Sequence, residues 1–186
     1  MKNSVHRLLV AAAVFAVALP LLAGGFNSEQ ELLAALDSPK EKDVVSALQG
    51  FEKDYPTSTA AMAKAKVLLG DPRMAVHRKA ARVLGVLHAD VSDADLKNIA
   101  ALLDSPAKDD VLDGLKALRG LKAQSVVPKI VPLLKNPDAN IKRDSCRTLA
   151  VIGSKDNVAD IEPLLQDPEK AVVKDANDAI FALKSK

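Results

Sequence analysis

Leu103-Asp104-Ser105-Pro106 ends a leucine-rich stretch with a proline that follows a short polar residue. The chain repeats this pattern as Leu36-Asp37-Ser38-Pro39, Leu69-Gly70-Asp71-Pro72, Leu134-Lys135-Asn136-Pro137 and Leu165-Gln166-Asp167-Pro168. The five prolines stand at positions 39, 72, 106, 137 and 168, so neighbouring copies are 33, 34, 31 and 31 residues apart. A period in this range indicates a stacked repeat protein, in which each unit buries its apolar face against its neighbours.

The residues after each proline predict one amphipathic helix per unit. An aliphatic residue lies four or five positions after the proline, a small residue eight positions after it, and a large apolar residue twelve positions after it. Steps of three to four residues place these side chains on one helix face, where the small residue lets a neighbouring helix come close. The five sets are Val44, Ala47 and Phe51; Val76, Ala80 and Leu84; Val111, Gly114 and Leu118; Ile141, Ser145 and Leu149; and Val172, Ala176 and Ile180.

A second apolar run precedes each proline and predicts another helix, so that each unit is a helix, a tight turn at the proline and a second helix. We expect Asp71 and Asp167 to cap helices that start at the following prolines. No strand-like alternation competes with this interpretation. The chain is therefore expected to be all-α, with ten helices near 28–36, 40–54, 58–69, 74–87, 93–103, 108–121, 125–134, 139–152, 156–165 and 169–183.

The turn at Pro72 continues into Val76-His77-Arg78-Lys79-Ala80-Ala81-Arg82-Val83-Leu84-Gly85. Related stretches follow Pro137, as Ile141-Lys142-Arg143, and Pro168, as Val172-Val173-Lys174. These stretches resemble HEAT repeats of the short type first recognised in phycobilin lyase subunits. Pro132 and Pro163 add to the resemblance, since the first helix of a HEAT unit is often kinked at this place.

This resemblance covers about residues 58–186 and implies the architecture. We expect a right-handed α-solenoid, or superhelix, of about five HEAT-like helix-turn-helix repeats, whose second helices line the concave surface. The stretch Phe51-Glu52-Lys53-Asp54-Tyr55-Pro56-Thr57-Ser58 is instead similar to tetratricopeptide proteins of the bacterial envelope. The units are expected near 28–54, 58–87, 93–121, 125–152 and 156–183.

The first 25 residues have the layout of a secretory signal peptide. Lys2 and Arg7 precede an unbroken apolar run from Leu8 to Ala23, and small residues follow it. The run is shorter than the roughly 20 residues that a membrane-spanning helix needs. We therefore predict a signal peptide over residues 1–25, a repeat domain over residues 26–186, and a protein that is periplasmic or extracellular and no longer in the membrane after cleavage.

Charge and chemistry exclude several classes of function. The chain has 26 basic and 24 acidic residues, and residues 1–25 contain two of the bases and no acid, so the remainder carries 24 of each. A neutral domain does not indicate a nucleic-acid partner. His77 and His88 lack the pattern of a metal site, and Cys146 has no histidine near it in sequence. We predict no catalytic residue, no metal and no cofactor, with His77 exposed and Cys146 buried.

One pattern suggests a binding surface. Bases gather six, ten and thirteen positions after the proline on the second helices, at spacings that keep each set on one helix face. We name these residues the basic ridge. Asp113, Asp144 and Asp175, seven positions after their prolines, would instead pair with bases of adjacent units in a solvated ladder of charges, and we favour this ladder because exposed runs of charge are common. The ridge residues are Arg78, Arg82, Lys116, Arg119, Arg143, Arg147 and Lys174.

These observations predict a non-enzymatic module or scaffold for protein–protein interaction, which is exported and binds a protein partner; if the basic ridge binds this partner, we expect the partner to be acidic. Two alternatives stay open. One is an accessory or chaperone-like subunit resembling the HEAT subunits of bilin lyases, and a bound pigment or turnover would favour it. The other is a tetratricopeptide-like envelope assembly factor, which would co-purify with envelope proteins. Short HEAT repeats also occur in a DNA glycosylase, but export and the scarcity of aromatic residues argue against nucleic-acid and bilin substrates.

Processing of the amino terminus is the first testable prediction. The mature chain is expected to begin at Gly24 or Phe26, because cleavage at either place follows small residues after the apolar run. Amino-terminal sequencing of the exported protein measures this directly. An intact Met1 in a membrane fraction would show that the segment is an anchor instead.

Overall fold

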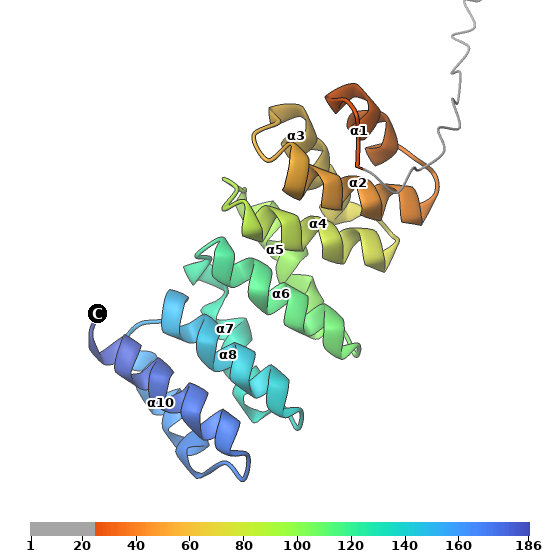
Figure 1. The fold of residues 1–186 in the computed structure, drawn as a ribbon. Coiled ribbons are helices and arrows are strands. Elements are labelled where there is room, and N and C mark those ends of the chain that lie inside the picture. Colours follow the sequence, from red (N-terminus) through yellow and green to blue (C-terminus); the bar gives the residue numbers. More distant parts are fainter. Residues whose placement is uncertain (1–24) are drawn as a thin grey trace, which may run out of the picture.

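The structure is a computed structural model that describes residues 25–186, so the predicted signal peptide lies outside the described residues except for Gly25. Within this range the chain forms ten α-helices and no strand (Figure 1). The helices are α1 (Glu29–Leu36), α2 (Glu41–Asp54), α3 (Thr59–Val67), α4 (Met74–Val86), α5 (Asp93–Ala101), α6 (Lys108–Gly120), α7 (Val127–Ile130), α8 (Ala139–Ile152), α9 (Val158–Ile161) and α10 (Lys170–Lys184).

The helices pair and stack as the sequence predicts. Each even-numbered helix packs against the next even-numbered one, and Figure 1 shows α2, α4, α6, α8 and α10 as one layer of neighbouring rods. The odd-numbered helices form the second layer, and α1 and α10 lie at opposite ends of the array (Figure 1). The fold is an all-α, right-handed solenoid of HEAT-like helix pairs, which confirms the predicted fold class.

The polar residue before each turn proline is explained by one hydrogen bond that its side chain accepts. In every unit the side chain before the proline accepts a hydrogen bond from the backbone N–H two residues further on, and this closes the turn. Asp71 accepts from the amide of Arg73 at 2.8 Å, and Asp167 accepts from the amide of Glu169 at 3.0 Å. Ser38, Ser105 and Asn136 accept in the same way at 3.2, 3.2 and 2.9 Å.

This geometry corrects the predicted role of Asp71 and Asp167. The helices after them begin at Met74 and Lys170, so neither aspartate caps a helix and neither proline is its first residue. The reason is that the short side chain satisfies the amide of the turn itself, which delays the helix by two residues. The chain thus reverses direction at the proline before the second helix starts.

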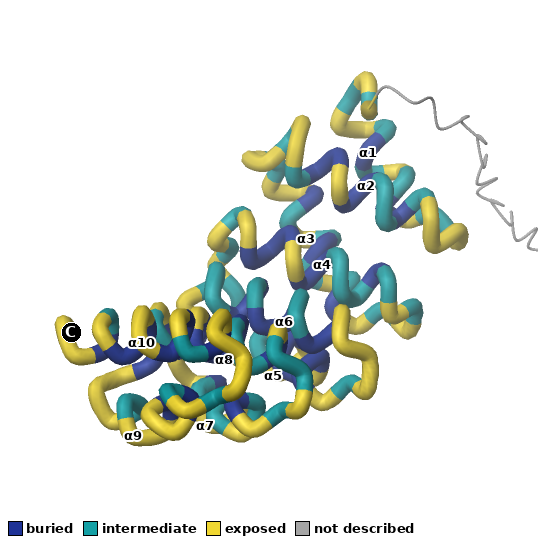
Figure 2. Tube along the Cα trace, turned by 60° about the horizontal axis from the view of Figure 1, so that its bottom comes forward, coloured by how far each residue is buried: buried dark blue, intermediate teal, exposed yellow. Residues whose placement is uncertain are grey.

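The predicted core positions are confirmed. All fifteen residues at the three repeated positions of the second helices, from Val44 to Ile180, are buried. Figure 2 shows buried segments in helices throughout the array and exposed residues at many of the turns between them. Val67, the last residue of α3, is the one large apolar residue of the first helices that is exposed, at 78%.

Prolines shorten the first helices of the last two units. The four-residue helices α7 and α9 give way to 3-10 helices over Val131–Lys135 and Glu162–Gln166, which contain Pro132 and Pro163 near their starts. A proline has no N–H to donate to the preceding turn, so the regular α-helical pattern ends at this point. The second helices of these units, α8 and α10, stay unbroken.

Two of the second helices touch backbone to backbone. A Cβ atom added to Gly120 of α6 would lie 2.3 Å from the carbonyl oxygen of Gly85 in α4, and one added to Gly85 would lie 2.6 Å from Cα of Ala117. Only residues without a side chain fit such contacts. The C-terminal ends of α4 and α6 are therefore held close together, and this brings the side chains around them to one place.

Because each unit packs against two neighbours, truncation of a core residue in a central unit is expected to lower the stability of the whole array. Leu118 of the third unit is fully buried, so Leu118→Ala is expected to lower the free energy of unfolding by about 2–5 kcal/mol through lost contacts and a residual cavity. Urea denaturation followed by circular dichroism measures the change. The matched control is Val67→Ala, which is expected to change stability by less than about 0.5 kcal/mol because the side chain is exposed. Equal effects of the two substitutions would contradict the assigned core.

Candidate partner-binding face

The seven bases of the ridge all lie on second helices, on the side away from the first helices. We call this side of the array the second-helix face. Arg78 and Arg82 come from α4, and the second helices of the next two units, α6 and α8, contribute a pair each. The face starts at α4, because α2 carries Val45, Gln49 and Glu52 at the corresponding positions. The remaining ridge residues are Lys116 and Arg119 of α6, Arg143 and Arg147 of α8, and Lys174 of α10.

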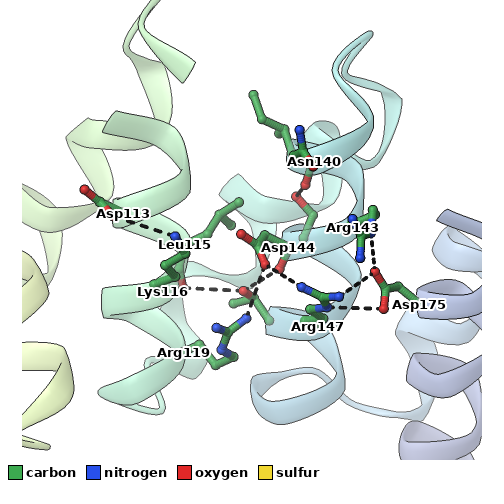
Figure 3. A network of polar contacts seen from close by, with 12 residues as sticks. Asp113, Leu115, Lys116, Arg119, Asn140, Arg143, Asp144, Arg147 and Asp175 are labelled. Carbon is green, nitrogen blue, oxygen red and sulfur yellow. Dashed lines mark hydrogen bonds and ion pairs between the residues drawn. The ribbon is translucent and has the colours of Figure 1, made fainter. Parts of the chain in front are cut away.

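Between α8 and α10 the positive charges are closely matched by buried carboxylates. Nε of Arg143 lies 2.7 Å from Oδ2 of Asp175, and Nη2 of Arg147 lies 3.1 Å from the same oxygen. Nη1 of Arg147 is also 3.4 Å from Oδ1 of Asp144, so this guanidinium lies between two aspartates (Figure 3). Asp144 and Asp175 are only 8% and 6% exposed. These contacts tie neighbouring units together as well as neutralising their charges.

Between α4 and α6 the matching is less even. Asp110 is 4% exposed, accepts a hydrogen bond from Ser105 Oγ at 2.7 Å and pairs with Arg78 at 3.3 Å. Asp113 lies within 4 Å of three bases: Nε of Arg78 at 3.4 Å, Nη1 of Arg82 at 3.2 Å and Nζ of Lys116 at 3.9 Å. Asp110 and Asp113 together offer two carboxylates to these three cations, so one positive charge is left over between α4 and α6.

The bases of α6 have the weakest partners. The two longest ion pairs within residues 25–186 are Lys116 with Asp113, at 3.9 Å, and Arg119 with Asp144, at 3.8 Å. Nη1 of Arg119 is shielded from solvent and donates no hydrogen bond. Lys174, at the far end, has Asp178 at 2.6 Å, and the hydrogen bond to this carboxylate raises the pKa of the lysine.

The structure therefore contains the ion pairs that the ladder alternative requires, with one change. Asp113, Asp144 and Asp175 each contact bases of an adjacent unit. The ladder is not solvated, however, because two of these aspartates are buried. Sequence reasoning also missed Asp110, although Ser105 five positions before it was a usable signal, since Ser38 and Asp43 form the same hydrogen bond in the first unit at 2.8 Å. Binding of a partner by the basic ridge stays a prediction.

Two hollows lie on the second-helix face. The larger, of about 690 Å³, lies between α2, α4 and α6 and is lined by charges of both signs, among them Glu52, Lys79 and Asp113. Lys79 pairs with Glu52 at 2.8 Å, so at this first junction the acid belongs to the earlier unit. The smaller, of about 510 Å³, lies at the C-terminal ends of α4 and α6 and extends to Val151 of α8.

Cys146 and His77, the cysteine and histidine considered as reactive groups above, both contact the protein interior or backbone. Cys146 is fully buried, as predicted, and burial raises the pKa of its thiol to about 12, so the thiol stays protonated at neutral pH. His77 is half-buried and not exposed as expected, because its Nε2 lies 3.1 Å from the carbonyl oxygen of Asn98 in α5.

Residues 25–186 contain no cluster of His, Cys, Asp and Glu side chains suited to a metal ion. In the same range no helix combines the length and apolar character that a membrane crossing requires.

Comparison with known proteins agrees with this architecture. Residues 97–183 match the family model of HEAT repeats. A chain from the complex of CpcE and CpcF of phycocyanin lyase from Nostoc sp. PCC7120 is similar at a TM-score of 0.72 and 20% identity, over 91% of this chain and 70% of that one. A designed armadillo repeat protein is similar at a TM-score of 0.57 and 17% identity, over 82% of this chain and 81% of that one. No curated protein matches the chain.

The buried ion pairs between α8 and α10 predict a large effect of one charge reversal. Arg143→Glu would place a carboxylate beside Asp175 and is expected to lower the free energy of unfolding by about 1–3 kcal/mol, since the buried acid loses one of its two partners and gains a like charge. Lys174→Glu makes the same change of charge beside the exposed Asp178 and is expected to cost less than about 1 kcal/mol. Urea denaturation compares the two variants. Equal losses of stability would mean that the buried pairs do not tie the units together.

Proposed function

We propose that the protein is a non-enzymatic scaffold that binds an acidic protein partner on its second-helix face. The observation that carries this proposal is the uneven neutralisation of the ridge, since the bases of α6 have only distant carboxylate partners. Such a face presents a local positive field on a domain that is neutral as a whole. Complementary charge speeds encounter with a partner and selects against partners of the same charge.

The repeat architecture supports a binding role. A solenoid gives each unit only its neighbours to pack against, which leaves a long, continuous surface on one side of the array. Two hollows on the second-helix face offer places for partner side chains. Membership of a repeat fold does not by itself identify a function, so the proposal rests on the charges and hollows and not on the fold.

Export to the periplasm or the cell exterior is part of the same proposal. It is supported by the basic start, the apolar run and the small residues of the first 25 positions. Phe26, which either predicted cleavage would retain, packs against Gly50, and its carbonyl accepts a hydrogen bond from Tyr55 at 2.9 Å. Removal of the leader is therefore compatible with an intact first unit.

A second candidate function is an accessory subunit of a lyase. It is favoured by the likeness to a chain of the phycocyanin lyase complex, which extends over 91% of this chain. At 20% identity this likeness supports the fold alone. Co-purification of a pigment with the protein, seen as visible absorbance, would favour this candidate over the scaffold.

The proposal predicts that partner capture depends on the second-helix face. Arg82→Gln with Lys116→Gln is expected to abolish affinity capture of the partner from the native envelope, since Arg82 is exposed, Lys116 is half-buried, and both bases share the carboxylate of Asp113. Arg147 is unsuited to the test, because its reversal would face both Asp144 and Asp175 and lower stability. The control, Lys97→Gln with Lys135→Gln, makes the same change of charge at exposed first-helix positions and is expected to retain capture.

Thermal unfolding of both double variants completes the experiment. Loss of capture at an unchanged thermal midpoint, together with retention by the control, supports the scaffold. Capture by the Arg82 and Lys116 variant at wild-type stability would remove the second-helix face from consideration.

A further inference from the structure

The smaller hollow has an unusual lining, and we call it the α4–α6 pocket. Four bases and one histidine surround its volume of about 510 Å³, and no carboxylate lines it. The larger hollow beside it includes both Glu52 and Asp113. Positive charge is therefore concentrated in one of two adjacent hollows. The polar residues that line the pocket are Arg82, His88, Lys116, Arg119 and Lys122.

Of the four bases that line the pocket, Arg82 alone has a carboxylate within hydrogen-bond distance, that of Asp113 at 3.2 Å. Lys122 makes no ion pair within residues 25–186, and those of Lys116 and Arg119 are the two longest in this range. The shielded Nη1 of Arg119 has no hydrogen-bond acceptor. Polar atoms in such a position normally have a partner, so the chain itself satisfies this guanidinium incompletely.

A need to cap the C-termini of α4 and α6 does not explain the bases of the pocket either. A helix C-terminus attracts cations through its free carbonyl groups. At the end of α6, however, the backbone amides of Leu121, Ala123 and Lys122 already donate to the last carbonyls, and the ring of His88 is 2.8 Å from the carbonyl of Gly120. Backbone amides cap the carbonyls of Val83, Leu84 and Gly85 near the end of α4 in the same way. The bases around the pocket are thus not needed as caps.

The backbone holds two of the lining residues in a costly conformation. His88 and Lys122 follow α4 and α6 at equivalent places, with φ of 50° and 52°. Within residues 25–186 they are the only residues other than glycine with positive φ. Glycine would adopt this left-handed conformation without strain, and strained residues gather at functional sites. Both turns instead carry long polar side chains, and both of these side chains line the pocket.

Apolar residues complete the pocket. Val86 of α4 and Val151 of α8 line it and are 49% and 44% exposed, although both belong to helices whose other faces are well buried. A ligand that enters the pocket therefore meets cations and aliphatic side chains together. Inorganic anions would use only the first of these.

We infer that the α4–α6 pocket binds carboxylate side chains from an acidic segment of a protein partner in which aliphatic residues accompany the acids. Arg119 and Lys122 donate charge-assisted hydrogen bonds to the carboxylate, and the two valines pack against the neighbouring aliphatic side chains. This inference rests on the proposed function, which it deepens by naming the pocket and the chemistry of the segment.

A defined peptide tests the pocket. The probe is a fluorescein-labelled peptide with the sequence Glu-Glu-Val-Val-Glu-Glu, in which either side of the extended chain presents both acids and a valine. Binding to the purified protein is measured by fluorescence anisotropy at low salt. The pocket variant is Arg119→Gln with Lys122→Gly, and it is expected to bind the probe at least about tenfold more weakly, because two charged donors are lost. Glycine suits the left-handed position of Lys122, so a thermal midpoint close to that of the wild type is expected.

Three controls make each outcome decisive. Lys97→Gln with Lys135→Gln removes two exposed charges elsewhere and should leave affinity within about twofold. Equal weakening by this control would mean general electrostatic attraction and would overturn the pocket. A peptide with glutamine in place of glutamate should not bind, and its binding would overturn the role of the carboxylates. Displacement of the probe by inorganic phosphate at constant ionic strength would identify a small-anion site instead.

Failure of the inference is distinguishable from failure of the proposed function. If the wild-type protein ignores the peptide, or if the pocket variant binds it equally well, while partner capture still depends on Arg82 and Lys116, the pocket assignment is wrong and the scaffold stands. If the peptide needs the pocket but no partner depends on the second-helix face, the proposed function is wrong and the carboxylate pocket stands.

Discussion

Each unit of this array can bury its apolar face only against the units on either side. This constraint sets the spacing of the second helices and therefore the pairing of charges on the second-helix face. Small residues let the helices approach closely: Gly114 lies against Leu102 and Leu103 at the end of the first helix of its own unit, and Gly85 and Gly120 bring α4 and α6 into backbone contact. Close approach brings bases of one helix within 4 Å of aspartates of the next. The same packing that forms the core thus also sets which charges are neutralised, because it fixes the distance between neighbouring second helices.

The consequence is a face that changes character along the array. Toward the C-terminal end, Arg143 and Arg147 converge on the buried Asp175, and their charge serves to join units. Around α6 the bases have distant partners, and the glycine contact between α4 and α6 gathers further side chains beside them. Under the proposed function, an acidic partner would be directed to the middle of this surface, where the charges are only weakly paired. This is how a fold without reactive side chains in evidence can still be selective.

Much of the fold could be predicted from the sequence, because helical periodicity reports directly on burial. The helix expected near 139–152 is α8, Ala139–Ile152, and all fifteen repeated core positions are buried. Local hydrogen bonding was harder to foresee, since the roles of Asp71 and Asp167 depend on whether the side chain closes a turn or caps a helix. The choice between ridge and ladder depends on distances between helices, which a single sequence does not contain. The α4–α6 pocket was hidden for a further reason: glycine usually marks a left-handed turn, whereas here the residues are His88 and Lys122.

The central claim is that neutralisation along the second-helix face is unequal, and double-mutant cycles measure it most directly. One cycle combines Arg143→Gln with Asp175→Asn, and the other combines Lys116→Gln with Asp113→Asn, with urea denaturation of every variant. The account predicts a coupling energy of about 1 kcal/mol or more for the first pair, whose carboxylate is buried, and less than about 0.3 kcal/mol for the second, whose atoms are far apart. Equal coupling energies in the two cycles, or a larger one for Lys116 and Asp113, would contradict it.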